Sequence, residues 1–264
     1  MPRVVGWLAV FVLVAAAAAY FWLQRPREPV PPPAPAVVEA PSDAPAEPQI
    51  RFPVPGADAA QALPKLDESD SLMRDALKGL ADTPTLAEQL LFADFVRRLV
   101  ATIDNVPTAK INLRLLPVKT AQGKFMTASD AQGIRLEPQN SARYAPYIKA
   151  VEALDSKRLV ALYVRYYPLF QQAYEELGYP KGYFNDRLMA VIDHLLAAPA
   201  APETVRLVQP EAMYRFADPE LEARSAGQKV LVRIGNANAA IVKDKLRSIR
   251  RELVALAPKP KPPG

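Results

Sequence analysis

The feature that most constrains this chain is an uncharged apolar run at residues 4–23, from Val4 to Leu23, followed by a segment dominated by proline and alanine at residues 25–64. A helix of twenty residues, rising about 1.5 Å per residue, matches the roughly 30 Å hydrocarbon core of a bilayer. Trp7 and Trp22 lie near the two ends, where amphipathic rings prefer the headgroup level. Residues 1–24 are therefore predicted to be a single transmembrane anchor, with the lipid bilayer as a partner.

A cleaved signal peptide is the alternative interpretation of this run. The chain begins with a basic start, and residues 15–19 are small alanines of the kind found at cleavage sites. The apolar run nevertheless continues through residues 20–23, past the point at which a signal peptide would turn polar. This continuation favours a retained anchor.

Basic residues flank the run on both sides, so charge bias alone does not set its orientation. Arg3 precedes the run, and Arg25 and Arg27 follow it. A long proline-rich tether is more useful in a bacterial periplasm, and a chain without cysteine is compatible with either compartment. We expect a single-pass protein of the bacterial inner membrane with a cytoplasmic amino terminus and a periplasmic domain.

The segment at residues 25–64 has almost no large apolar side chain before Ile50 and Phe52. It cannot bury enough apolar surface to fold, and its prolines favour extended polyproline II geometry. We expect a disordered linker that acts as a spacer, and a docking site for a proline-recognising partner is the alternative. The tail at residues 258–264 is predicted to be disordered as well.

Residues 65–257 provide enough chain for one domain with a single core. The expected fold class is mainly α (α+β), a helical domain with a small β-hairpin or short sheet. Short alternations around residues 124–127 and 134–136 predict the hairpin, and two short strands at 205–208 and 213–216 are expected to pair with it. Apolar residues recurring at helical spacing predict helices near residues 70–80, 84–105, 142–154, 157–177 with a kink at Pro168, 183–197, 218–234 and 239–256.

Several motifs in this region are specific enough to suggest a family. They are RYAPY at 143–147, YYPLFQQAYEELGYP at 166–180, FNDRL at 184–188, VIDHLL at 191–196, FADP at 216–219 and SAGQK at 225–229. With these motifs the chain resembles the proteobacterial domain of unknown function 3014 over residues 63–256. The resemblance implies a bitopic envelope protein with the same anchor and tether, and it brings no activity, ligand or catalytic residue.

Composition excludes several kinds of chemistry. With one histidine and no cysteine, the chain cannot form a cysteine nucleophile, a thiolate metal site or a multi-histidine zinc site. No phosphate-binding glycine loop and no G-x-S-x-G motif is present. We therefore expect no catalytic residue, no metal and no cofactor.

His194 beside Asp193 is the one pair that suggests a catalytic or pH-sensing role. Adjacent residues on a helix point about 100° apart, so these two side chains should not face each other. We expect a boundary histidine that is satisfied by a backbone or tyrosine partner, and a catalytic or pH-sensing role is the alternative.

Nine of the ten tyrosines lie between Tyr144 and Tyr214, and several recur at helical spacing around Pro168. Such rings either pack a core with one wet end or, with neighbouring charges, line a groove for a peptide, a glycan strand or a partner helix. The candidate partner-binding residues are Tyr163, Arg165, Tyr166, Tyr167, Tyr174, Glu175, Tyr179, Tyr183, Asp186 and Arg187.

The last predicted helix combines an apolar stripe with basic faces. Its candidate basic surface consists of Lys243, Lys245, Arg247, Arg250 and Arg251. This surface either is a solvated face of a core helix or attracts acidic headgroups, an acidic envelope polymer or an acidic partner. A net charge of +5 is mild, and no nucleic acid partner is expected.

These observations predict a membrane-tethered periplasmic adaptor or scaffold domain of the bacterial cell envelope that binds an envelope protein or glycan and is not an enzyme. Two alternatives stay open. One is a peptidoglycan- or glycan-binding module. The other is an envelope hydrolase that uses carboxylates such as Glu175, Glu176 or Asp186, which would require some of them to be buried with a raised pKa.

Overall fold

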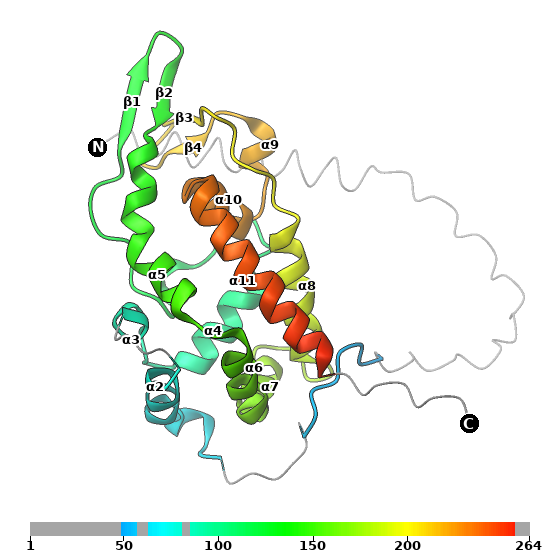
Figure 1. Ribbon diagram of the computed structural model, residues 1–264. Helices are drawn as coiled ribbons and strands as arrows, with labels where there is room; N and C mark the ends of the chain where they lie inside the picture. Colours follow the sequence, from blue (N-terminus) through cyan, green and yellow to red (C-terminus); the bar gives the residue numbers. More distant parts are fainter. Residues whose placement is uncertain (1–48, 57–62, 81–84, 257–264) are drawn as a thin grey trace, which may run out of the picture. The chain divides into compact units, whose positions relative to one another are not determined.

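The computed structural model describes residues 49–56, 63–80 and 85–256, which form a mainly helical domain with a small four-stranded antiparallel sheet (Figure 1). The predicted fold class is confirmed for this domain. The predicted anchor, most of the predicted linker and the tail at 258–264 lie outside the described residues. In the part of the chain that is described, no helix has both the length and the apolar character needed to cross a bilayer.

The longest helix of the described residues is α11, which packs on α5, α6, α8 and α10 and so connects most of the domain. The helices are α2 (Asp70–Lys78), α3 (Thr85–Gln89), α4 (Phe95–Asn105), α5 (Ala145–Ala153), α6 (Ser156–Arg165), α7 (Tyr167–Glu176), α8 (Phe184–Leu196), α9 (Pro219–Glu222), α10 (Ala226–Arg233) and α11 (Asn236–Ala255), with short 3-10 turns at Leu66–Glu68, Leu113–Leu115 and Pro138–Tyr144.

The structure divides the predicted second helix into α3 and α4, so the prediction of one continuous helix is wrong. Leu90 leaves the helix to form an antiparallel bridge with Val118. Asp94 adopts a left-handed conformation with φ of 52°. The carboxylate of Asp70 then accepts the N–H groups of Asp94 and Phe95, both at 2.9 Å. A carboxylate remote in sequence therefore caps α4, and local periodicity cannot indicate such a contact.

Two other predicted helices are also divided. The helix expected to kink at Pro168 is interrupted at Tyr166, and Pro168 lies in the first turn of α7, where its missing N–H costs no helical hydrogen bond. The helix expected from Asp218 to Ile234 becomes α9 and α10, because the Ser225 hydroxyl starts a new helix by accepting the N–H of Gln228 at 3.2 Å.

The predicted hairpin and its pairing with two later strands are confirmed. The sheet has the order β1 (Thr127–Asp130), β2 (Gly133–Leu136), β3 (Arg206–Val208) and β4 (Arg215–Phe216), and every pair is antiparallel. Leu207 lies opposite Ile134 on one side and opposite Phe216 on the other. Leu207 and Phe216 are buried and form a small core with α9 and α10.

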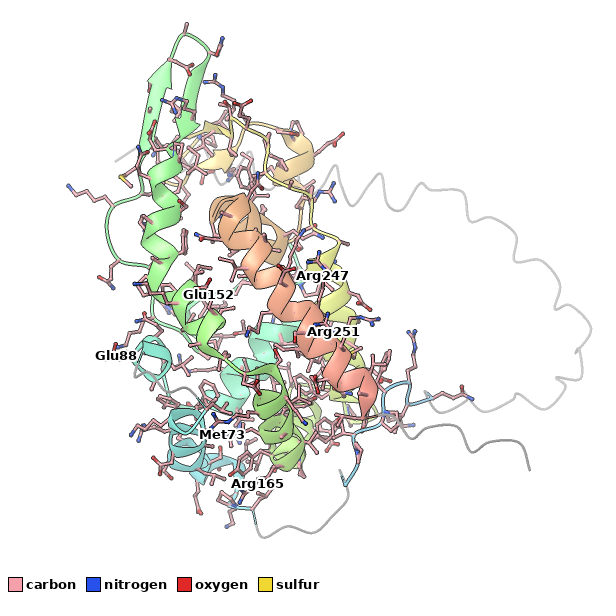
Figure 2. All side chains as sticks on the ribbon, viewed as in Figure 1. Met73, Glu88, Glu152, Arg165, Arg247 and Arg251 are labelled. Atoms are coloured by element: carbon pink, nitrogen blue, oxygen red, sulfur yellow. The ribbon has the colours of Figure 1, made fainter. Side chains whose placement is uncertain are left out.

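The main core lies at the other end of the domain, between α2, α4, α6, α7 and α8. Met73, labelled in Figure 2, is almost fully buried there, as are Val100, Tyr167 and Phe184. The predicted tyrosine-rich region therefore contributes α6, α7 and the start of α8 to the main core.

Candidate functional site

The structure turns most of the candidate tyrosines inward. Their rings pack edge to face or tilted against one another, as in the pair Tyr163 and Tyr167, whose centroids are 5.5 Å apart. Of the six candidate tyrosines, only Tyr179 is exposed, at 42 %. Tyr166, Tyr167 and Tyr174 are buried, and Tyr163 and Tyr183 are half-buried. Burial makes the first three part of the core, which corrects the groove hypothesis for these side chains.

The hydroxyl groups of the inner tyrosines are bonded to a small amide network. Tyr167 donates to Oε1 of Gln171 at 3.0 Å and accepts the N–H of Asn185 at 3.3 Å. The same Gln171 oxygen accepts the N–H of Phe184 at 2.9 Å, and Tyr163 donates to Oδ1 of Asn185 at 3.1 Å. Burial, reinforced by the neighbouring tyrosines, raises the pKa of Tyr163 and of Tyr167 well above the ordinary value. The network links α6 and α7 to the first turn of α8.

The same turn of α8 binds residues 51–54, a segment we call the strap. The carboxylate of Asp186 accepts the N–H groups of Arg51 and Phe52 at 2.9 and 2.8 Å. Nδ2 of Asn185 donates to the carbonyl oxygen of Phe52 at 2.8 Å. The hydroxyl of Tyr183 accepts the N–H of Val54 at 2.7 Å. All four hydrogen bonds recognise the backbone of the strap.

Two side chains of the strap are also held by the domain. Val54 is 4 % exposed and belongs to the main core. Phe52 packs against a second cluster that includes Met189 and Leu253. In Figure 1 the strap, drawn in blue, lies beside the carboxyl end of α11. The composition of residues 51–54 predicts a disordered linker, whereas in the structure their N–H groups and apolar side chains have partners far away in the chain.

Another set of candidate residues surrounds Asp104 near the carboxyl end of α4. Nε of Arg187 donates to Oδ1 of Asp104 at 2.8 Å, and Nη2 donates to the backbone carbonyl of Asp104 at 2.6 Å. The hydroxyl of Tyr179 donates to Oδ2 of Asp104 at 3.2 Å, and its ring stacks on Tyr174 with centroids 4.6 Å apart. The charge of Asp104 raises the pKa of Tyr179, and burial, followed by Asp104, raises the pKa of Tyr174. This cluster joins α4 to the α7–α8 connection.

The remaining candidates of the tyrosine-rich region lie at the surface. Arg165 is exposed, with its guanidinium carbon 5.3 Å from the ring centroid of Tyr166. Glu175 and Glu176 are exposed too, and they accept bonds from neighbouring glutamines of α7. The hydrolase hypothesis requires buried carboxylates, and neither glutamate is buried. Within residues 49–56, 63–80 and 85–256, no cluster of ligating side chains could hold a metal ion.

Two lysines of the candidate basic surface are used inside the domain. Nζ of Lys243 donates to the carbonyl oxygen of Ala198 at 2.5 Å, just beyond the carboxyl end of α8. Nζ of Lys245 donates to the carbonyl oxygen of Leu154, which ends α5. Cations are favourable at the carboxyl ends of helices, where carbonyl groups lack helical partners. These lysines therefore cap two neighbouring helices, which corrects their assignment to a surface for an external partner.

The arginines of this surface differ from the lysines. Nε of Arg250 lies 2.6 Å from Oδ1 of Asp193, and this hydrogen bond holds the pKa of Arg250 above its ordinary value. Arg247 bonds to Asp244 on its own helix at 2.5 Å. Figure 2 labels Arg247 and Arg251 on α11, and both are exposed. Arg251 bonds to no other described residue, so the outward basic surface is reduced mainly to these two arginines.

His194 is a half-buried boundary residue. Its Nε2 lies 2.7 Å from the hydroxyl oxygen of Ser225, and its carbonyl oxygen accepts Nε2 of Gln228 at 2.9 Å. Asp193 accepts a hydrogen bond from Arg250. Asp193 and His194 therefore do not face each other, as their adjacent positions on a helix predict. The histidine is satisfied, although its partner is a serine hydroxyl and not the expected backbone or tyrosine group. Ser225 is buried and caps α10, so this pair is structural.

Sequence reasoning missed several residues that hold these sites together. Gln171 and Asn185 carry no periodicity signal, because amides occur equally on solvated faces. Asp104 did carry a signal, since a carboxylate in the last turn of a helix is unfavourable unless a cation compensates it. That rule would have indicated a partner such as Arg187.

The chain is thus a mainly helical domain in which Tyr183, Asn185 and the carboxylate of Asp186 bind the backbone of the strap. A comparison with family models matches residues 95–250 to the family described as Protein of unknown function (DUF3014). The match covers more than half of the chain, so the chain belongs to this family, as the resemblance of its motifs indicates. Comparisons with curated proteins and with solved structures give no match.

Proposed function

We propose that this chain is a membrane-tethered, non-enzymatic adaptor or scaffold of the bacterial cell envelope, with a periplasmic domain that binds an envelope protein or glycan. The observation that carries the proposal is the strap. The proline-rich segment follows an apolar run long enough to span a bilayer, and its residues 51–54 are bound to the start of α8 by Tyr183, Asn185 and Asp186. A spacer that is attached to the domain through specific hydrogen bonds is suited to holding that domain at a distance from the membrane.

The mechanism is tethered recognition. A chain as long as residues 25–50 would reach on the order of 80 Å if it were fully extended at about 3.1 Å per residue. An anchor at one end confines the domain to a layer of that depth and raises its effective concentration for partners in the same layer. The strap joins the tether to α8, which packs directly on α4, α7 and α11.

The chemistry of the domain supports binding over catalysis. The single histidine is bonded to the serine that caps α10. Glu175 and Glu176 are exposed, and the Asp186 carboxylate is engaged by two backbone N–H groups. The candidates that still face solvent are Arg165, Glu175 and Tyr179, together with Arg247 and Arg251 on α11.

Membrane topology is the first test. Alkaline phosphatase is fused after Gly264 in a Gram-negative host, and a reporter that is active only in the cytoplasm is fused at the same point in a second strain. Phosphatase activity is expected. Activity of the cytoplasmic reporter alone would contradict the periplasmic placement and redirect the search to partners at the inner leaflet.

Strap attachment is tested by tryptic cleavage after Arg51 in the full chain. Asp186→Ala removes the acceptor of two strap N–H groups and should accelerate this cleavage several-fold. Asp193→Ala is the matched control, because it also removes a carboxylate from α8 but contacts Arg250 and not the strap. Equal acceleration in both variants would show that general loosening of α8, and not the strap, controls cleavage.

Partner binding is tested by photo-crosslinking in cells. A photoreactive residue is placed at Tyr179 or at Arg165, and the control position is Met213 near the sheet, which is 71 % exposed. We expect an envelope protein or a glycan strand to be captured from the first two positions and not from the control. Capture from the control alone would contradict the proposed face, and glycan capture would favour the glycan-binding alternative.

A further inference from the structure

An apolar cavity of about 320 Å³ lies inside the helical end of the domain. Its wall is formed by side chains from six helices, α2, α4, α6, α7, α8 and α11. One residue from each is Met73, Leu99, Leu162, Phe170, Leu188 and Ile249.

Among the described residues, the wall offers no free polar group. Tyr163 is the one wall residue with a polar side-chain atom, and its hydroxyl donates to Oδ1 of Asn185. A buried water needs two to four polar partners, and apolar cavities of about 150 Å³ with similar linings stay dry and bind small apolar molecules. This cavity is therefore suited to an apolar occupant and not to water.

The size of the cavity limits the occupant. Protein interiors are close-packed and contain few voids larger than a water molecule. A volume of about 320 Å³ is roughly twice that of a cavity that accepts the six carbons of benzene, so it has room for on the order of ten to twelve carbons.

Access to the cavity does not require the domain to unfold. Met73 and Phe170 are buried, whereas Leu99, Leu162 and Leu188 on the same wall remain partly accessible to solvent. No lysine or arginine of the described part of the chain lines the cavity, so its wall recognises a chain and not a charged headgroup.

We propose that this cavity binds a single alkyl chain of about ten carbons, with the polar end of the ligand in solvent. The inference stands on the cavity alone and does not depend on the proposed tethering function. Two sources share this chemistry, a free fatty acid and the acyl chain of a membrane lipid.

The test uses the full chain in phospholipid nanodiscs, which avoids alkyl detergents. In one arm a fatty acid of ten carbons with a terminal diazirine is added. In the other arm the diazirine is on the acyl chain of a nanodisc phospholipid. After irradiation, the labelled peptides are identified by mass spectrometry, and unlabelled decanol serves as competitor. Labelling of α4, α6 and α8 that decanol suppresses is the expected result, and the arm in which it occurs identifies the source.

Leu99→Trp is designed to fill the cavity, and labelling should fall at least tenfold in this variant. The matched control is Leu113→Trp, at a position that is 65 % exposed and outside the cavity, and its labelling should equal that of the wild type. Ile103→Phe is a second filling variant in case Leu99→Trp does not fold. The proposal is overturned if wall peptides are unlabelled in both arms, if decanol does not compete, or if a folded filling variant labels like the wild type.

Discussion

The tyrosine-rich region, from α6 to the first turn of α8, and the last helix, α11, place their polar groups in different directions. In the first region the hydroxyls of Tyr163 and Tyr167 point inward and are bonded to amides. In α11 the charged ends of Lys243 and Lys245 extend across the surface to the carboxyl ends of neighbouring helices. The tyrosine-rich region stabilises the fold through burial of its rings, whereas the lysines of α11 add small electrostatic contributions to the stability of the fold.

The tyrosine-rich region and α11 were both expected to bind a partner, but most of their polar groups are bonded within the domain, for two different physical reasons. Aromatic rings are drawn into a core because their burial is worth several kcal/mol, and their hydroxyls must then find internal partners. Lysine side chains are long enough to pack along an apolar surface and still place the ammonium at a helix end. Mutations should therefore have large effects in the first region and small effects in the second.

The largest effect is expected from Tyr167→Ala. The side chain is fully buried, and its loss leaves a cavity and removes the acceptor of the Asn185 N–H, so the free energy of unfolding should fall by about 4 kcal/mol. Urea denaturation measures this change. The matched variant is Tyr179→Ala at the exposed tyrosine, for which a loss of about 1 kcal/mol is expected. Similar losses in both variants would remove the contrast between inner and outer tyrosines.

Alkaline pH should destabilise the tyrosine-rich region next. The pKa of Tyr163 and that of Tyr167 are raised by burial, so their contribution is fully present below about pH 10 and is lost as pH rises toward the folded-state pKa. In that window the unfolded chain loses protons that the folded chain keeps. The free energy of unfolding should fall by up to about 1.4 kcal/mol per pH unit for each tyrosine.

Urea midpoints at pH 8, 10 and 11 measure this decline. Lysines also titrate in the same range, so the comparison that isolates the tyrosine is with Tyr163→Phe. This variant should show a shallower decline than the wild type. An identical slope in the two proteins would argue against a Tyr163 hydroxyl that stays neutral in the folded state.

Arg187→Met tests the cluster around Asp104. The Asp104 side chain is only 12 % exposed and would lose its ionic partner, so a loss of about 2 kcal/mol is expected, reduced from the fully buried case because Arg187 is partly exposed. The control is Arg97→Met, whose partners Asp67 and Glu176 are 77 % and 42 % exposed, and its cost should stay below about 1 kcal/mol. Thermal denaturation of both variants measures the two losses of stability. Equal losses would mean that Asp104 is better solvated than its burial indicates.

The smallest effect is expected in α11. Lys245→Met removes the cation at the end of α5 and should cost about 1 kcal/mol at low salt. Arg251→Met, at an exposed position of the same helix, should change stability by less than about 0.5 kcal/mol. Melting temperatures at low and high salt separate the two, since only the Lys245 effect should shrink with salt. A larger cost for Arg251→Met would indicate that this arginine has a structural role.

Local sequence information was sufficient for the elements with clear periodicity or turn residues. Leu72, Met73 and Leu77 predicted α2, and the glycine at position 133, with φ of 110°, fits the predicted hairpin. Local information failed where a distant group decided the backbone, as at the start of α4, which is capped by Asp70. It failed for the strap as well, because the composition of residues 51–54 does not reveal the acceptors on α8.

The mainly helical class, the small sheet, the family and the exclusion of cysteine and multi-histidine chemistry follow from the amino-acid sequence alone, because they depend on composition, spacing and local motifs. Which polar groups are already bonded within the domain follows only from how the helices pack. Whether Asp186 binds a partner or residues 51 and 52, and whether Lys245 faces an acidic surface or Leu154, depends on hydrogen bonds between residues about a hundred positions apart. Such bonds form only after the helices pack, since burial of the core brings the donors and acceptors together.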